Sequence, residues 1–283
     1  YPIFLFSSFA GYPVGAKMIL SEYDNGHISK RHAEMLSGVC FGAGPAFVCG
    51  CISGQLYNTP TATKIILFST IGANLFIAFL LSFYFRKNKI PLSSTSKKPR
   101  FHNGILTDCI LSGGRSIAEI CFTIIAFSVI VCGLKDSGII SMIASLISKI
   151  TGLSIDCSEP LISSFLDITS IGNLPKGNYA ILPWICGLTS FGSVCILFQI
   201  STLISGKFSI KPLILIRFAT AITSFALCKI SMPFMLKNEI ISVSAIEAQL
   251  YQPTSPIPSV MLILMTFMLF FEFGKDKKHS ALE

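Results

Sequence analysis

The sequence predicts an all-α polytopic membrane protein whose inverted repeat contains interrupted or re-entrant helices. Hydrophobic residues make up 52% of the 283 residues and charged residues only 13%, whereas a soluble domain carries about 25% charged residues. Long apolar stretches alternate with short basic loops, and further apolar stretches are interrupted by Gly, Pro and Ser. This composition excludes a water-soluble fold and also excludes intrinsic disorder.

Several apolar stretches are long enough to form membrane-spanning helices of about 20 residues. They cover residues 65–85, 117–134, 182–204, 212–228 and 259–273. Three other apolar segments, 1–20, 36–56 and 160–175, contain too many Gly, Pro and Ser residues for an uninterrupted helix. Irregular backbone persists at membrane depth only where protein buries it or where it lines a wet cavity. We therefore expect these three segments to be re-entrant or interrupted.

The basic residues predict the orientation of the chain in the membrane. The loop 86–100 holds six basic residues and no acidic residue, and short cytoplasmic loops carry such an excess. Threading the chain from this loop places Lys30, Lys207 and the tail after Lys275 on the cytoplasmic side as well. The net charge of +8 thus fits membrane topology, so we expect a lipid bilayer, and no nucleic acid, as a partner.

The order of these elements repeats with reversed sense. In each half, a broken segment is followed by a glycine-containing membrane crossing and then by an uninterrupted helix. The broken segment enters the membrane from the cytoplasmic side in the first half and from the outer side in the second. We expect a first repeat over 1–100 and an inverted second repeat over 101–230. An outer loop, a last transmembrane helix and a basic cytoplasmic tail follow over 231–283. This architecture is typical of secondary transporters.

The first broken segment contains candidate substrate-binding residues. Gly11, Tyr12, Pro13 and Gly15 precede a lone cation, Lys17. Proline and glycine interrupt the helix and leave backbone amides free to face an anion, to which the lysine adds a positive charge. The alternative is a surface turn whose lysine extends to the cytoplasmic interface.

The second broken segment contains Asp167, followed by Thr169 and Ser170. An ionisable group within a membrane segment is costly and is a functional-site hypothesis by default. We expect the carboxylate to bind a coupling proton or cation, with the two hydroxyl groups as neutral ligands. Alternatively, Asp167 caps the interruption through amide hydrogen bonds or lies at the outer interface.

Further candidates lie in the crossings. Arg217 is a candidate anion ligand, although it lies close enough to Lys211 to extend to the cytoplasmic interface. Gln199 and Asn74 are hydrogen-bonding groups that either contact a solute or join helices. The remaining candidate substrate-binding residues are Gly42, Gly44, Pro45, Ser190 and Gly192.

The sequence contains no enzyme motif that we recognise, and we expect no catalysis, cofactor or metal. The four histidines fall in predicted cytoplasmic loops or the tail, and strings of the GxSxG, HExxH and P-loop types are absent from the sequence. Most of the ten cysteines lie in apolar runs, where we expect free thiols.

Several strings resemble those of a known family. They are Gly-Tyr-Pro-Val-Gly-Ala-Lys over 11–17, Gly-His-Ile-Ser over 26–29, Ala-Gly-Pro-Ala-Phe over 43–47, and Asp167, Thr169, Ser190, Phe191, Gly192 and Gln199. The chain resembles the YlbJ (SpoVV) family of sporulation integral membrane proteins, within the nucleoside-recognition or Gate-domain superfamily. Two positions depart from that pattern, because Asp167 stands where the family has Glu and Ser193 replaces a second Gly.

The resemblance implies a multi-pass protein of endospore-forming bacteria, in a membrane of mother-cell origin around the forespore. It implies transport of a small organic anion resembling dipicolinate, an aromatic dicarboxylate, and a chain that lacks the family's N-terminal helices. We also expect the protein to form a homo-oligomer. The alternatives are a non-transporting scaffold for assembly of the spore envelope or cortex, and a nucleoside or ion carrier.

Overall fold

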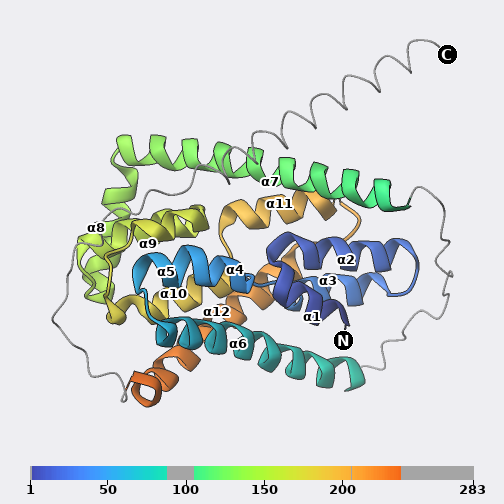
Figure 1. Cartoon of the computed structure of the whole chain (residues 1–283), viewed down its shortest axis with the longest axis horizontal. Helices are drawn as coiled ribbons and strands as arrows, with labels where there is room; N and C mark the ends of the chain where they lie inside the picture. The colour runs from blue at the N-terminus through green and yellow to red at the C-terminus, as the bar shows by residue number, and fades with distance from the viewer. Residues whose placement is uncertain (1, 88–104, 205, 237–283) are drawn as a thin grey trace, which may run out of the picture. The chain divides into compact units, whose positions relative to one another are not determined.

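The computed structural model describes residues 2–87, 105–204 and 206–236, and within these ranges every regular element is a helix (Figure 1). The predicted last helix at 259–273 and the basic tail lie outside the described residues. The chain divides into two compact units, one of residues 1–102 and 118–238 and the other of residues 103–117 and 239–283.

The four predicted spanning stretches within the described residues are confirmed. Helices α6 (Pro60–Lys87), α7 (Ile105–Asp136) and α12 (Lys211–Met235) are each long and apolar enough to cross a membrane, as is the stretch Tyr179–Ile204. The chain is therefore an all-α polytopic membrane protein. Phe68, Phe79 and Phe218 are exposed on these helices, as expected of side chains that face lipid.

The two broken segments of the first half are interrupted where glycines occur. Helix α1 (Pro2–Ala10) ends at Gly11, and α2 (Tyr12–Asp24) begins directly after it. Gly11 has φ 91°, a conformation that is costly for residues with a Cβ atom. Helix α3 (Lys30–Val39) is followed by extended chain, after which α4 (Pro45–Phe47), a π-helical turn (Val48–Ser53) and α5 (Gly54–Leu56) form one short rod.

The second half contains corresponding interruptions and one element that we did not predict. Helix α8 (Ile139–Thr151) bends by 115° into α9 (Ile155–Leu166). The broken segment therefore begins about 20 residues before the predicted start at residue 160, because the left-handed glycines Gly138 and Gly152 bound α8. Short 3₁₀ helices η2 (Ile168–Asn173) and η3 (Tyr179–Ile181) precede α10 (Leu182–Phe191), which Gly192 separates from α11 (Val194–Ile204).

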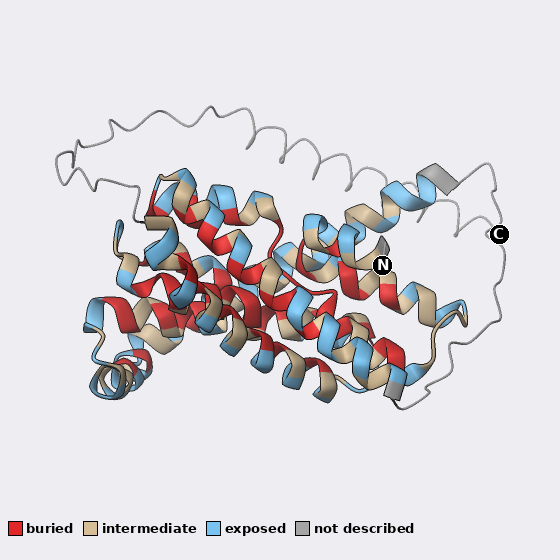
Figure 2. Ribbon diagram, turned by 90° about the horizontal axis from the view of Figure 1, so that it is seen from below, coloured by how far each residue is buried: buried red, intermediate tan, exposed pale blue. Residues whose placement is uncertain are grey.

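The two halves exchange equivalent contacts. Helix α12 packs on α3 and on α10, and α6 packs on the same two helices. Helix α2 contacts α11, and α6 packs against α12 (Figure 1). In the same way, η2 contacts the π-helical turn. Such reciprocal pairing is what an internal two-fold relation produces. The buried residues lie where these helices face one another, while exposed residues lie on the outer faces (Figure 2).

At the end of the bundle that the sequence places in the cytoplasm, an ionic contact joins the two halves. Lys207 Nζ lies 2.6 and 2.8 Å from the two carboxylate oxygens of Asp24, and the Ser209 amide donates to Glu34 Oε1 over 2.9 Å. We call this contact the Lys207 clasp. Both partners of the ion pair are more than two-fifths exposed, so solvent screens their attraction.

A neutral contact joins the halves at the opposite end. The Tyr57 hydroxyl donates to the Asn178 carbonyl oxygen over 3.0 Å, and the Gly177 amide donates to the Leu56 carbonyl oxygen over 2.8 Å. The rings of Tyr57 and Tyr179 lie 5.0 Å apart. We call this contact the Tyr57 clasp. It involves the loop between α5 and α6 and the loop between η2 and η3.

Candidate functional site

The interruptions of the two halves meet at one place in the bundle. A Cβ atom on Gly44 would lie 3.0 Å from the Phe9 carbonyl oxygen and 3.5 Å from Gly11 Cα, so the first two interruptions touch through their backbones. Gly192, in the fourth interruption, packs against the ring of Phe41 in the second. Only glycine leaves room for such close approach of two backbones.

A cavity of about 290 Å³ lies among these interruptions, and we call it the interruption cavity. Its lining comes from α1, α2, α4, α7, α11 and the start of η2. The lining residues are Phe9, Ala10, Gly11, Tyr12, Pro13, Gly44, Ala46, Phe47, Ile120, Ile124, Asp167, Ile168, Thr169, Cys195, Ile196 and Gln199. Both halves thus contribute to a single partly apolar chamber of a size suited to a small solute.

The interruption cavity is bordered by the amino-terminal ends of helices. Tyr12 and Pro13 begin α2, Ala46 lies in the first turn of the rod that starts at Pro45, and Cys195 lies in the first turn of α11. The first amides of a helix have no partner within the helix and carry partial positive charge. The cavity is therefore surrounded by three helix ends that favour negative charge.

Asp167 is the one charged side chain among the described residues of the lining, and it is only 2% exposed. Its Oδ1 accepts the Thr169 amide over 3.2 Å. Its Oδ2 accepts the Thr169 hydroxyl over 2.7 Å and the Ser128 hydroxyl, from α7, over 3.1 Å. The carboxylate therefore caps η2, as one of the sequence-based alternatives predicted, and also faces the cavity.

Arg217 holds the carboxyl-terminal ends of two interrupted helices. Its Nη1 donates to the carbonyl oxygens of Phe41, after α3, and Ser190, near the end of α10, over 2.7 and 2.9 Å. Its Nη2 donates to Asn74 Oδ1 over 2.6 Å and to Thr220 Oγ1 over 2.9 Å. The guanidinium therefore neutralises partial negative charge on freed carbonyls in both halves.

Tyr12 connects the cavity with this arginine cluster. Its hydroxyl donates to the Thr189 carbonyl oxygen over 2.6 Å, which is another freed carbonyl of α10. Its ring packs edge-on against Phe41 at 5.1 Å, and the Arg217 guanidinium carbon lies 4.9 Å from the centre of the Phe41 ring. Cation, aromatic rings and interrupted backbones thus form one packed unit.

The structure brings together seven of the residues proposed from sequence. The interruption cavity is lined by Gly11, Tyr12, Pro13, Gly44, Asp167, Thr169 and Gln199. The other candidates are Gly15, Lys17, Gly42, Pro45, Ser170, Ser190, Gly192 and Arg217, and none of these eight lines it.

Several of these eight residues have a packing role. A Cβ atom on Gly15 would collide with the Cys40 carbonyl oxygen, and one on Gly42 would lie 3.1 Å from the Asn74 amide nitrogen. Pro45 starts α4, where proline suits the first turn. Ser170 lies within η2.

The interpretation that Arg217 extends to the cytoplasmic interface is wrong. The residue is fully buried at 0% exposure, and its guanidinium donates hydrogen bonds to freed carbonyls of the two crossings within the bundle. Lys17 is half-buried on α2, beyond the lining residues of that helix. Neither cation is placed to contact a solute in the interruption cavity.

Ser128 is a residue of the site that sequence reasoning missed. It lies within the predicted spanning stretch of α7, where one hydroxyl among apolar residues gives no signal of its own. Its position becomes informative only through its contact with Asp167, 39 residues away.

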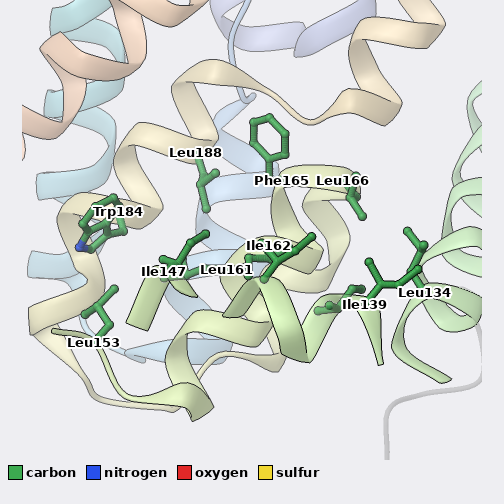
Figure 3. A pocket seen from close by; sticks show the side chains of 12 residues that line it. Leu134, Ile139, Ile147, Leu153, Leu161, Ile162, Phe165, Leu166, Trp184 and Leu188 are labelled. Carbon is green, nitrogen blue, oxygen red and sulfur yellow. The ribbon is translucent and has the colours of Figure 1, made fainter. Parts of the chain in front are cut away.

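Two larger pockets have a different character. One of about 540 Å³ lies between the α8–α9 hairpin and α10, and its lining side chains, including Ile147, Leu161, Phe165 and Trp184, are all aliphatic or aromatic (Figure 3). A second, of about 440 Å³, shares Phe165 and Trp184 with it. Neither supplies converging polar groups that could orient a polar solute. The interruption cavity is therefore the better candidate site.

Comparison with family models, curated proteins and solved structures gave no match.

Proposed function

We propose that this protein is a membrane transporter that binds a small organic anion in the interruption cavity, with Asp167 as the site of a coupling ion. The observation that carries the proposal is that interruptions of both halves line one chamber. Interrupted helices are costly in a membrane and are tolerated where they line a cavity. In secondary transporters, sites at such interruptions bind both the solute and the coupling ion.

The polarity of the helix ends supports an anionic solute. Helices α2 and α11 and the rod from Pro45 to Leu56 direct their amino-terminal ends at the cavity. Their carboxyl-terminal counterparts in α3 and α10 are neutralised by Arg217. The cavity is thereby left with the partial positive charge of the interruptions.

The resemblance to the YlbJ family supports a dipicolinate-like anion and a membrane around the forespore. A planar aromatic dicarboxylate is chemically suited to the chamber, since Phe9, Phe47 and Ile196 offer apolar walls. The carboxamide of Gln199 and the helix amides offer hydrogen-bond donors for carboxylates.

A second candidate is a carrier of neutral polar solutes such as nucleosides. It is favoured by one observation: among the described residues, no Lys, Arg or His side chain lines the cavity. A site without a cationic side chain suits a neutral solute that donates hydrogen bonds to Asp167.

Uptake by proteoliposomes tests the proposal. We expect saturable uptake of labelled dipicolinate that protein-free liposomes lack. Replacing Gln199 by Ala is expected to raise KM about fivefold, the equivalent of one lost hydrogen bond of about 1 kcal/mol. Gln55→Ala is the matched control, because Gln55 is an exposed carboxamide that does not line the cavity.

The outcomes separate the candidate functions. Uptake of labelled uridine without uptake of dipicolinate would favour the neutral-solute carrier. Absence of uptake of both solutes by folded protein, under proton and sodium gradients in either direction, would favour the non-transporting scaffold.

A further inference from the structure

The carboxylate in the lining of the interruption cavity opposes the binding of an anion. Asp167 is buried within the lining, and an anion beside an ionised carboxylate in a poorly solvated chamber would experience like-charge repulsion. The two candidate cations do not relieve it, because Arg217 is engaged by carbonyls on the far side of the interruptions and Lys17 does not line the cavity. When two acidic groups share such a site, one of them holds a proton.

We propose that Asp167 is protonated whenever the interruption cavity holds an organic anion, so that one proton moves with each anion. This inference rests on the proposed function and names its coupling ion. The proton enters from water on one side of the membrane, binds a carboxylate oxygen of Asp167, and returns to water on the other side after the anion leaves. No covalent bond to the solute forms or breaks.

The neighbours of Asp167 favour a proton over a metal cation. Both carboxylate oxygens already accept hydrogens, from the Thr169 amide and hydroxyl and from the Ser128 hydroxyl. A hard cation needs several oxygen lone pairs directed at it, whereas these hydroxyls direct their hydrogens at the carboxylate.

The other groups that face Asp167 do not replace the proton. Tyr12 of α2, whose hydroxyl donates to the Thr189 carbonyl oxygen, and Cys195 and Gln199 of α11 also line the cavity. Helix α7 contributes the Ser128 hydroxyl, and α1 and α4 contribute apolar side chains and backbone. None of these groups carries a positive side-chain charge, so a proton on Asp167 is the direct way to remove the repulsion. Within the described part of the chain, the Thr169 amide is the one donor to Oδ1, so this is the oxygen with room for that proton.

The inference is tested with the reconstituted protein, with labelled dipicolinate as the probe. Uptake is measured under an imposed pH gradient and, separately, under a sodium gradient at equal pH, with the membrane potential clamped in both. Equilibrium binding is measured at mildly acidic and mildly alkaline pH. The variants are Asp167→Asn and the control Asp156→Asn, which changes an exposed carboxylate in the first turn of α9.

We expect the pH gradient to drive accumulation of the probe and the sodium gradient to leave uptake unchanged. Binding to the natural protein and to Asp156→Asn should weaken by about tenfold for each unit of rising pH over the alkaline range, as one linked proton requires. Asp167→Asn mimics the neutral acid, so it should bind the probe at both pH values with similar affinity. It should exchange the probe across the membrane without accumulating it.

Three results would overturn the inference. The first is sodium-driven accumulation that a pH gradient does not produce, and the second is binding to the natural protein that is independent of pH. The third is loss of binding in Asp167→Asn when the variant elutes as folded protein. In all three the probe still binds the natural protein, so the proposed anion site survives; absence of binding and uptake at every pH would overturn the proposed function along with the inference.

Discussion

The interrupted helices have two chemically different sides. On the cavity side, the amino-terminal ends of α2 and α11 face a chamber that contains one buried carboxylate. On the other side, the carboxyl-terminal ends of α3 and α10 are bound by one buried guanidinium, that of Arg217. Each interruption therefore exposes both hydrogen-bond donors and hydrogen-bond acceptors. In this protein, Arg217 donates hydrogen bonds to freed carbonyl oxygens within the fold. The amino-terminal helix ends, which carry the free amide donors, border the candidate site.

Stability and binding should therefore respond to different substitutions. Removing a group that satisfies buried carbonyls leaves unpaired acceptors in an apolar environment, which costs folding free energy. Removing a group that only lines the cavity leaves space that water or solute can fill.

Arg217→Ala is expected to have the largest effect. The substitution leaves two backbone carbonyls, Asn74 and Thr220 without their buried donor. We expect the free energy of unfolding to fall by about 3 kcal/mol, the cost of removing one partner from a buried charged network. Thermal unfolding in detergent measures the change.

Arg115→Ala is the matched control, because Arg115 is exposed on α7. Its transition temperature should stay close to that of the natural protein. Equal transition temperatures for Arg217→Ala and the natural protein would contradict the division between the two sides.

Gly192→Ala is expected to have an intermediate effect. The backbone at Gly192 has φ 78°, and an added Cβ would lie 2.7 Å from Phe41 Cζ. Backbone strain and crowding together should lower the free energy of unfolding by about 2 kcal/mol. Gly187→Ala, within the preceding helix α10, should be neutral or slightly stabilising, since its Cβ would make only ordinary contacts at 3.5 Å or more. Similar losses in the two variants would show that α10 tolerates no added methyl group and that the interruption has no special role.

The two clasps give the smallest predicted effects. Lys207→Ala removes an exposed ion pair and should lower the free energy of unfolding by less than about 1 kcal/mol, and the loss should shrink as salt is added. Tyr57→Phe removes a neutral hydrogen bond to the Asn178 carbonyl and should cost about 1 kcal/mol at any salt concentration. Unfolding measured at low and high potassium chloride distinguishes them. A loss in Tyr57→Phe that also disappears at high salt would refute the assignment of different chemistry to the two ends.

Much of the fold could be predicted from local sequence. The stretches 65–85 and 212–228 lie within α6 and α12, because a long apolar run in a membrane satisfies its backbone only as a helix. The interruption at Gly11 followed from glycine and proline chemistry in the same way. Helix α8 was missed, because its 13 residues are too few for a spanning helix and no local pattern indicates that it pairs with α9.

The candidate site was predicted in part. A lone carboxylate within an apolar segment is costly wherever it lies, so Asp167 could be recognised without a structure. The partner of Arg217 could not be recognised, because every arginine can bind either a solute or a carbonyl. Its local spacing from Lys211 even indicated the wrong environment.

The amino-acid sequence is enough to predict that the chain crosses a membrane as helices, that several of those helices are interrupted, and that Asp167 lies in an apolar segment. These properties depend on the cost of exposing polar groups to lipid, which each segment meets locally. The tertiary structure alone decided which side of the interruptions each group faces. Arg217 reaches the carbonyl of Phe41 across 176 positions of the chain, and Ser128 reaches Asp167 from a helix of its own. Such contacts depend on how the two halves pack together, and local hydropathy carries no record of that packing.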